Sequence, residues 1–143
     1  MSFTGEFRHT IDTKGRLIVP SRLRDQLEGD DVVLVRSPDG CVDMWSGPGW
    51  ESYERKLLEQ RRSDPGNRSV IRSIAASAHT DQVDRQGRMT MPAHLRRHAG
   101  IDRDVVVIGA FDHAEIWSPD RWEQEQARVG EGRLNELVQA MDF

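Results

Sequence analysis

The sequence predicts an α+β fold made of two duplicated halves. The segment DTKGRLIVP, from Asp12 to Pro20, returns 72 residues later as DRQGRMTMP, from Asp84 to Pro92. Each half also has the same order of short apolar segments with strand character and longer segments with helical spacing. Two copies are too few for a solenoid, which needs at least about three repeats to build its core. We therefore expect two related halves that share one domain.

A single register without insertion or deletion aligns residues 12–51 with residues 84–123. The aligned pairs are Leu23 with Leu95, Arg24 with Arg96, Asp30 with Asp102, Val33 with Val105, Val35 with Val107, Trp45 with Trp117, and Trp50 with Trp122. Duplicated aromatic residues that flank a turn are most often core residues, and we expect the tryptophans to pack where strand meets helix.

Turn and cap signals divide the first half into elements. Asp12 and Gly15 indicate a tight turn, because Asp bonds backbone amides and Gly supplies a positive φ. Pro20 suits the start of a short helix, and a Gly-Pro-Gly break at residues 47–49 precedes a longer one. The expected strands are residues 6–11, 16–19, 32–36 and 41–45, and the expected helices are residues 21–27 and 50–62.

The second half repeats this order after a linker helix. Asn67 is expected to cap the linker helix, and Gly100 to end the short helix that follows Pro92. The buried face of the linker helix is expected to hold Val70, Ile71, Ile74 and Ala75. The expected strands are residues 78–83, 88–91, 105–108 and 115–117, and the expected helices are residues 92–99 and a last paired helix from residue 118.

The chain therefore divides into a first repeat with its helix at 1–62, a linker helix at 63–77, a second repeat with its helix at 78–129, and a tail at 130–143. The tail is acidic and weakly amphipathic, and its apolar residues indicate a docking helix. Those residues are Leu134, Leu137, Val138 and Met141.

Composition points to a modest core and an ionic surface. The 143 residues are 36% hydrophobic and 31% charged, with a net charge of −4, and small duplicated halves often gain buried area by oligomerising. The single cysteine, Cys41, excludes an intramolecular disulfide, and we expect no cysteine-based zinc site and a reducing compartment. No segment has the length or hydrophobicity of a signal peptide or a membrane helix. We expect a cytoplasmic protein.

The strongest candidate functional motif is Asp-x-x-Gly-Arg, present in both halves. Its glycines are Gly15 and Gly87, and Asp12 and Asp84 are expected to close the turns and to hold the arginines that follow. Arg16 and Arg88 present planar donor groups suited to guanine or phosphate. The alternative is a structural Asp–Arg bridge alone. Exposed ion pairs contribute little to stability, so two copies inside basic islands at residues 8–24 and 85–97 favour a binding role.

Other basic residues near the motifs are weaker candidates. Arg24 and Arg96 fit phosphate contact and a solvated helix face equally well. Arg8, Lys14 and Arg85 extend the basic islands, although each alone is typical of an ordinary surface residue.

Enzyme and metal signals are weak. His94 and His98 have the i, i+4 spacing of a metal pair, but no further ligands cluster with them, and a basic helix face is the better interpretation. Cys41 aligns with His113, which argues against a paired catalytic role. We expect no enzyme activity, no cofactor and no small-molecule substrate.

The chain resembles the MraZ family of bacterial transcriptional regulators over about residues 3–130, and three segments carry the resemblance. They are RHTIDTKGRLIVP from Arg8 to Pro20, DRQGR from Asp84 to Arg88, and LRRHAG from Leu95 to Gly100. The resemblance implies AbrB-like, swapped-hairpin β-barrel halves with flanking helices, assembled into ring-shaped homo-oligomers. It also implies binding of double-stranded DNA at short direct repeats upstream of the division and cell-wall gene cluster.

On this resemblance the DNA-contacting arginine is Arg16, with Arg88 as its equivalent. We expect Arg16 and Arg88 to reach base edges and Lys14, Arg8, Arg24 and Arg85 to hold phosphates in a nucleoid-associated regulator. The two loops need not contact DNA equally, because Arg85 and Gln86 replace Thr13 and Lys14. The competing hypothesis is an antitoxin-like interaction module whose arginine loops dock an acidic partner, with the tail covering it.

Overall fold

The computed structural model describes residues 2–130 and 132–143, and it is a mixed α+β structure. The first half contains β1 (Glu6–Thr10), β2 (Arg16–Ile18), α1 (Ser21–Arg24), β3 (Asp31–Arg36), β4 (Val42–Ser46) and α2 (Gly47–Ser63). A 3-10 turn, η1 (Pro65–Asn67), and α3 (Arg68–Ser77) follow. The second half contains β5 (His79–Gln82), β6 (Arg88–Thr90), α4 (Ala93–Ala99), β7 (Asp104–Gly109), β8 (Ala114–Trp117), α5 (Pro119–Val129) and α6 (Leu134–Gln139).

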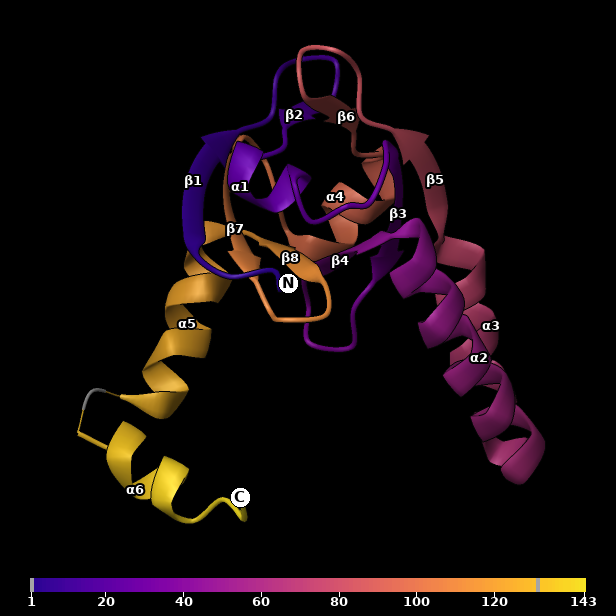
Figure 1. Ribbon diagram of the computed structural model, residues 1–143, viewed down its shortest axis with the longest axis vertical. Coiled ribbons are helices and arrows are strands. Elements are labelled where there is room, and N and C mark those ends of the chain that lie inside the picture. The colour runs from indigo at the N-terminus through magenta and orange to yellow at the C-terminus, as the bar shows by residue number, and fades with distance from the viewer. Residues whose placement is uncertain (1, 131) are drawn as a thin grey trace.

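The two halves are interleaved, because strands pair across them. The main sheet is antiparallel with the order β1-β7-β8-β4-β3-β5, so each half's first strand lies on the other half's hairpin. A separate two-stranded ribbon joins β2 to β6 above this sheet (Figure 1). One main core therefore contains residues of both halves, including Leu17, Leu23, Met89 and Leu95. Sharing one core suits halves too small to bury enough surface alone.

A pseudo-twofold axis relates the halves, and it passes through two pairs of equivalent residues. In the ribbon Leu17 faces Met89, and in the sheet Asp43 faces Glu115. Both pairs are separated by the repeat length, as antiparallel pairing about a twofold axis requires. The molecule thus has a ribbon end and a sheet end on one axis.

The uniform register predicted for the halves is wrong in the middle. Val32 corresponds to Val105, since both point into the main core from the second residue of β3 and of β7. The second half has one extra residue before β7, where α4 is longer than α1 and is capped by Gly100, whose φ is 66°. It then loses one residue in the hairpin turn, at 110–113 against 37–41. The two changes compensate, so the register is restored in β4 and β8.

Two helix boundaries differ from the expected ones for local reasons. The helix α2 begins at Gly47, because the Ser46 hydroxyl accepts from the Gly49 N–H at 3.1 Å and Pro48 lies where no N–H is needed. The Gly-Pro-Gly segment is therefore the first helical turn and not a break. The helix α1 ends at Arg24, because the next backbone bonds, from Gln26 N–H to the Leu23 carbonyl and from Leu27 N–H to the Arg24 carbonyl, span three residues and not four.

The linker also corrects two expectations. Asn67 does not cap α3 with its side chain, which donates instead to the Gln60 carbonyl at 3.1 Å. Ile71 and Ile74 are buried as expected, but Val70 is 57% exposed and Ala75 is also exposed. The buried stripe of this helix is therefore narrower than the apolar pattern suggested.

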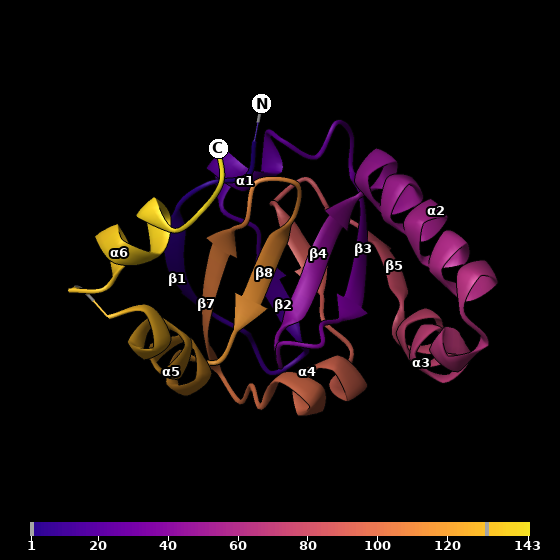
Figure 2. The same cartoon turned by 90° about the horizontal axis from the view of Figure 1, so that it is seen from below.

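The helices α2, α3 and α5 pack on the outer face of the sheet, away from the main core. Figure 2 shows α2 and α3 on one side and α5 and α6 on the other. Trp45 and Trp117 are buried there, which confirms their predicted core role, and Trp50 and Trp122 pack against them.

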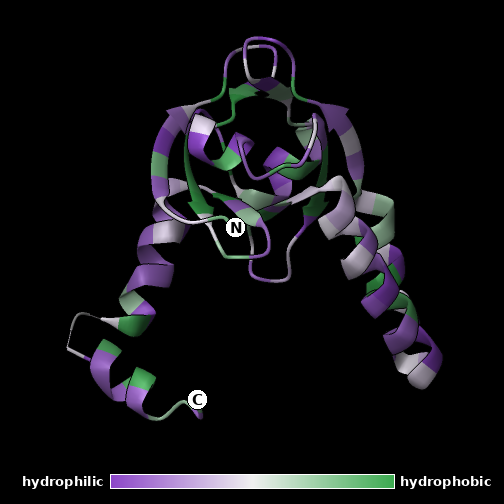
Figure 3. Cartoon of the chain, in the orientation of Figure 1, coloured by the Kyte–Doolittle hydropathy of each residue, from purple (hydrophilic) through white to green (hydrophobic). Residues whose placement is uncertain are grey.

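The tail forms α6, but it does not dock on its own chain. Leu134 and Met141 are 53% and 59% exposed, and the apolar positions of α6 stand clear of the main body (Figure 3). Among the helices that the structure describes, none is long and apolar enough to cross a membrane.

Candidate nucleic-acid interface

The two Asp-x-x-Gly-Arg turns have the same geometry. Asp12 Oδ1 accepts from the backbone N–H groups of Lys14 and Arg16, each at 2.9 Å, and its Oδ2 accepts from Arg16 Nε at 2.9 Å. Asp84 makes the same three contacts with Gln86 and Arg88, again at 2.9 Å. Each carboxylate thus closes its turn and fixes the direction of one arginine.

These contacts favour the ionised carboxylates. Donation from the Arg16 backbone N–H is the main reason why the pKa of Asp12 lies below its ordinary value, and Arg88 has the same effect on the pKa of Asp84. Only Nε of each arginine is used. Within the described residues, the terminal nitrogens of Arg16 and Arg88 have no protein hydrogen-bond partner. Two terminal nitrogens, with four N–H donors, therefore remain available on each guanidinium.

The ribbon places both arginines on one face. Antiparallel pairing sets Arg16 opposite Thr90 and Ile18 opposite Arg88, while Leu17 and Met89 point into the core. Because strand side chains alternate between faces, the two arginines, Ile18 and Thr90 all lie on the outward face. We call these four residues, Arg16, Ile18, Arg88 and Thr90, the ribbon face. The turns stand side by side above it (Figure 1).

Each half braces the other half's turn. Met91 N–H donates to the Gly15 carbonyl and Val19 N–H to the Gly87 carbonyl, each at 2.8 Å. Both glycines are buried, with φ of 79° and 80°, in the left-handed region that glycine tolerates best.

Two arginines from the short helices fill the space beneath the turns. Arg24 of α1 lies against Gly87, so closely that no Cβ fits there unless this side chain moves. Arg96 of α4 lies near Gly15 in the same way, 3.6 Å from the place of a Cβ. Arg24 is therefore half-buried under the turn of the opposite half, and is not a freely solvated helix residue.

The remaining basic candidates lie around the turns at different depths. Lys14 and Arg85 are exposed at the turn tips. Arg8 lies on β1, with its guanidinium 3.6 Å from the Glu6 carboxylate and 64% of its side chain exposed. The structure thus brings Arg16, Arg88, Lys14 and Arg85 to one end of the molecule and leaves Arg8 on the flank.

His94 and His98 are neither a metal pair nor a simple basic face. His94 Nε2 lies 3.1 Å from the Ser77 carbonyl, and His98 Nε2 lies 2.9 Å from the Ser37 carbonyl. Each ring links α4 to a different segment, so the expectation of a merely basic helix face is corrected.

Two residues of the ribbon face, Ile18 and Thr90, were not expected from the sequence. Ile18 is 51% exposed and Thr90 is exposed, although both belong to apolar-looking strands. Strict alternation from Arg16 through Leu17 was the available signal, because it puts residue 18 on the same face as the arginine.

The fold and its paired turns define a duplicated α+β protein with one exposed basic ribbon. A family model described as "MraZ protein, putative antitoxin-like" matches residues 2–73 and again residues 74–141. The protein named transcriptional regulator MraZ of Ligilactobacillus salivarius is 43% identical over 121 residues, covering 85% of this chain and 84% of that one. The relatives of the same name from Moorella thermoacetica and Heliobacterium modesticaldum are 40% and 38% identical, and each comparison covers 99% of this chain and 98% of the relative.

The chain belongs to the MraZ family. The family model matches twice, once in each half, in agreement with the duplication seen in the sequence and with the repeated order of strands.

Proposed function

We propose that this protein is a transcriptional regulator that binds double-stranded DNA in a sequence-specific manner through the ribbon face. The observation that carries the proposal is the position of Arg16 and Arg88 on one outward face, each aimed by an aspartate. The major groove of B-DNA admits a two-stranded ribbon, and Arg is the usual reader of guanine O6 and N7. The relatives' name, transcriptional regulator, supports the same function.

The base-reading role falls to the arginines because their Nε–H groups are already engaged. A guanidinium held at Nε keeps its terminal nitrogens at a defined angle and loses less conformational entropy when it binds. Lys14 and Arg85, exposed at the turn tips, are placed to hold phosphates on either side. Arg8 would contact phosphate from the flank. Arg24 would act mainly through the turn that it supports, with any phosphate contact secondary.

The finer assignments extend this proposal. The pairing of β1 with the second half's hairpin, and of β5 with the first half's hairpin, supports the swapped-hairpin, AbrB-like assignment. The proposed repeats are residues 1–62 and 78–129, joined by the linker helix at 63–77. We further propose a ring-shaped homo-oligomer, direct repeats upstream of the division and cell-wall gene cluster as the DNA target, and a cytoplasmic, nucleoid-associated location. A ring presents many ribbons, so weak contacts add through effective concentration on repeated sites.

A binding titration tests the proposal. Genomic fragments selected by the purified protein are labelled, and fluorescence anisotropy measures their affinity for the Arg16→Ala variant. Loss of a base contact should weaken binding by about 1–3 kcal/mol while the thermal unfolding curve stays unchanged. Arg61→Ala is the matched control, because it removes the same charge from the last turn of α2, far along the chain from both turns.

Equal loss in the Arg61 variant would mean that general charge, and not the ribbon, carries the binding. Affinity should also fall steeply with salt, with a log–log slope near −0.9 for each phosphate contacted. A flat salt response, or unchanged affinity in the Arg16 variant, would overturn the assignment.

The second candidate is an antitoxin-like interaction module. The observation in its favour is the exposed apolar surface of the tail, at Leu134 and Val138 of α6 and at Met141 after it. In that case deletion of residues 130–143 would abolish capture of a protein partner, and the Arg16 variant would bind DNA as the unchanged protein does.

A further inference from the structure

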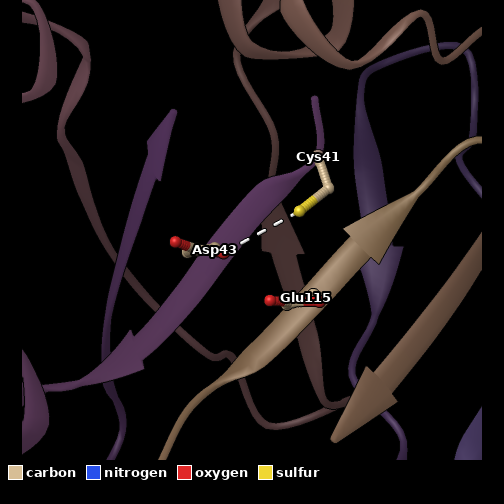
Figure 4. A group of neighbouring side chains, drawn as sticks. All are labelled: Cys41, Asp43 and Glu115. Carbon is tan, nitrogen blue, oxygen red and sulfur yellow. Dashed lines mark hydrogen bonds between the residues drawn. The ribbon is translucent and has the colours of Figure 1, made fainter. Parts of the chain in front are cut away.

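The sheet end of the axis carries a cluster of unlike side chains on its outer face. Alternation along β4 puts Cys41, Asp43 and Trp45 on this face, and alternation into β8 adds His113 and Glu115. Val42 and Ile116, between them, point into the main core. Figure 4 shows Cys41 and Asp43 along β4, with Glu115 beside them on β8. The pseudo-twofold axis runs between Asp43 and Glu115.

The donor atoms of this cluster converge. One Sγ and two carboxylate oxygens, from Cys41, Asp43 and Glu115, all lie within 4.8 Å of one another. Cys41 Sγ is 3.8 Å from Asp43 Oδ1, and His113 Nε2 is 3.5 Å from the same oxygen and 3.1 Å from Glu115 Oε2. Ligands bound at about 2.0–2.3 Å to one tetrahedral ion lie roughly 3.3–3.8 Å apart. Three of the six donor pairs, Cys41–Asp43, His113–Asp43 and His113–Glu115, have distances within or close to this range.

His113 is oriented as a metal-binding histidine is. Its Nδ1 lies 2.6 Å from the Asp112 carboxylate, and its ring stacks on Trp45 with the centroids 4.6 Å apart. A carboxylate on the far nitrogen fixes the tautomer and presents the near nitrogen to an ion. Here that near nitrogen faces Asp43 and Glu115.

The cluster is buried but reachable. Cys41 is fully buried and Asp43 is 6% exposed, yet Asp43, His113 and Glu115 line an open cavity of about 550 Å³. Trp45 lines the same cavity, and its buried Nε1 has no hydrogen-bond partner within the described residues. The cavity gives an ion a path to the donors, and the Trp45 N–H leaves a donor for a bound water.

Charge in the cavity favours a cation. The lining carboxylates are Asp39, Asp43, Asp112 and Glu115, and the lining cationic side chains are Lys56 and His113. Even with a charged imidazole, negative groups outnumber positive ones, and burial of unpaired charge is costly. A divalent ion would neutralise this excess.

We propose that Cys41, Asp43, His113 and Glu115 bind a divalent transition-metal ion of the zinc class at the sheet end of the axis. Thiolate, imidazole and carboxylate together suit zinc or a similar borderline-soft ion, and do not suit magnesium or calcium, which prefer oxygen ligands. Metal ions bind the thiolate and the neutral imidazole, so binding displaces the Cys41 thiol proton, and any proton on His113 Nε2, to solvent. This site is separate from the ribbon face and does not depend on DNA binding.

Cobalt(II) is the probe, because a cobalt–thiolate bond produces an intense near-ultraviolet charge-transfer band. Cys41 is the single cysteine of the chain, so such a band reports this residue alone. The full-length protein, freed of metal, is titrated with cobalt(II), and zinc(II) is then added to displace it. We expect a one-to-one endpoint for each chain, loss of the band on zinc addition, and no band in the Cys41→Ser variant.

A second pair of variants separates binding from general electrostatics and from misfolding. Asp112→Asn removes the partner of His113 Nδ1 and should weaken zinc binding by about 10–100-fold. Asp39→Asn removes the same charge from the same cavity without touching a donor, and should change affinity much less.

Absence of a thiolate band in the folded, unchanged protein would overturn the proposal. A band that survives Cys41→Ser, or equal losses in the Asp112 and Asp39 variants, would also overturn it. Thermal unfolding of each variant in the absence of metal shows that it is folded.

Discussion

The two ends of the pseudo-twofold axis differ in how similar the duplicated residues are. At the ribbon end the paired residues are chemically the same, since Asp12 and Asp84 make identical contacts to Arg16 and Arg88. At the sheet end Cys41 stands opposite His113 in the repeat, and Asp43 opposite Glu115. Where the two halves have the same residues, the turn is present twice. Where they have different residues that meet on the axis, those residues can form a single site.

Burial explains why the pKa of Asp43 at the sheet end is shifted in the opposite direction from that of Asp12 at the ribbon end. The Asp12 side chain is 42% exposed, and donation from the Arg16 backbone N–H lowers its pKa. Burial raises the pKa of Asp43, against the opposing hydrogen bond from His113. Burial lowers the pKa of His113, but hydrogen bonds to its carboxylate neighbours outweigh this and raise the pKa to about 10. Charged groups contact one another at both ends, but they are partly exposed to water at the ribbon end and largely buried at the sheet end.

The largest expected effect is on the core beneath the ribbon. Leu17 is 1% exposed on the axis, so Leu17→Ala should lower the free energy of unfolding by about 2–5 kcal/mol. Urea unfolding measures the change, and Ile18→Ala on the exposed ribbon face is the control, expected to lose much less. Equal losses in the two variants would mean that the ribbon does not cover the core as described.

The next effect compares the two buried tryptophans. Trp117 Nε1 donates to Glu115 at 3.1 Å, whereas the buried Nε1 of Trp45 has no partner within the described residues. Trp117→Phe should therefore destabilise the protein by about 1–2 kcal/mol more than Trp45→Phe does. Thermal and urea unfolding of both variants, side by side, measure the difference, and a larger loss for Trp45→Phe would contradict it.

A smaller effect should separate the two turns. Lys14→Gln gives the first turn the residue that the second has at Gln86, and should make the slope of DNA affinity against salt shallower by about 0.9. Gln86→Lys should make the slope steeper by a similar amount if the second turn also approaches phosphate. An unchanged slope in the Gln86 variant, together with a changed one for Lys14, would show that only the first turn makes this contact.

The smallest effect is on the turns in acid. Both aspartates have a pKa below the ordinary 3.8, so their contribution to stability is complete above that value. It is lost as the pH falls through the lowered pKa of the folded state. The Nε–H signals of Arg16 and Arg88, followed by NMR on lowering the pH, should disappear together. Disappearance of one signal well before the other would show that the turns are not equivalent.

Local features were predictable from the sequence, and contacts between the halves were not. The turn at Asp12 depends on residues within five positions, so its geometry follows from Asp and Gly alone. The pairing of β1 with β7 could not be predicted from the alternation of apolar and polar residues. The β3–β4 and β7–β8 hairpins have the same pattern, so β1 and β5 could each pair with either hairpin. The one-residue change of register that pairs Val32 with Val105 could not be seen in the sequence for a similar reason, because both strands contain consecutive valines.

The candidate sites were predictable to the same limited degree. Arg16 and Arg88 could be chosen from their repeated motif, and the resemblance to a known family agreed. Ile18 was overlooked because an apolar residue in a strand is usually buried. Cys41 and His113 were set aside because they differ between the copies, although that difference is what brings unlike donors to the axis.

The bracing of each turn by the opposite half has a consequence for how the protein can change. Arg24 lies under the turn of Gly87, and Arg96 lies near that of Gly15. A substitution in α1 is therefore expected to affect the turn at Gly87 in the second half, and a substitution in α4 is expected to affect the turn at Gly15 in the first half. An adjustment of one turn therefore involves the helix of the other repeat, so the two turns are linked and neither repeat contains both a turn and the arginine that supports it.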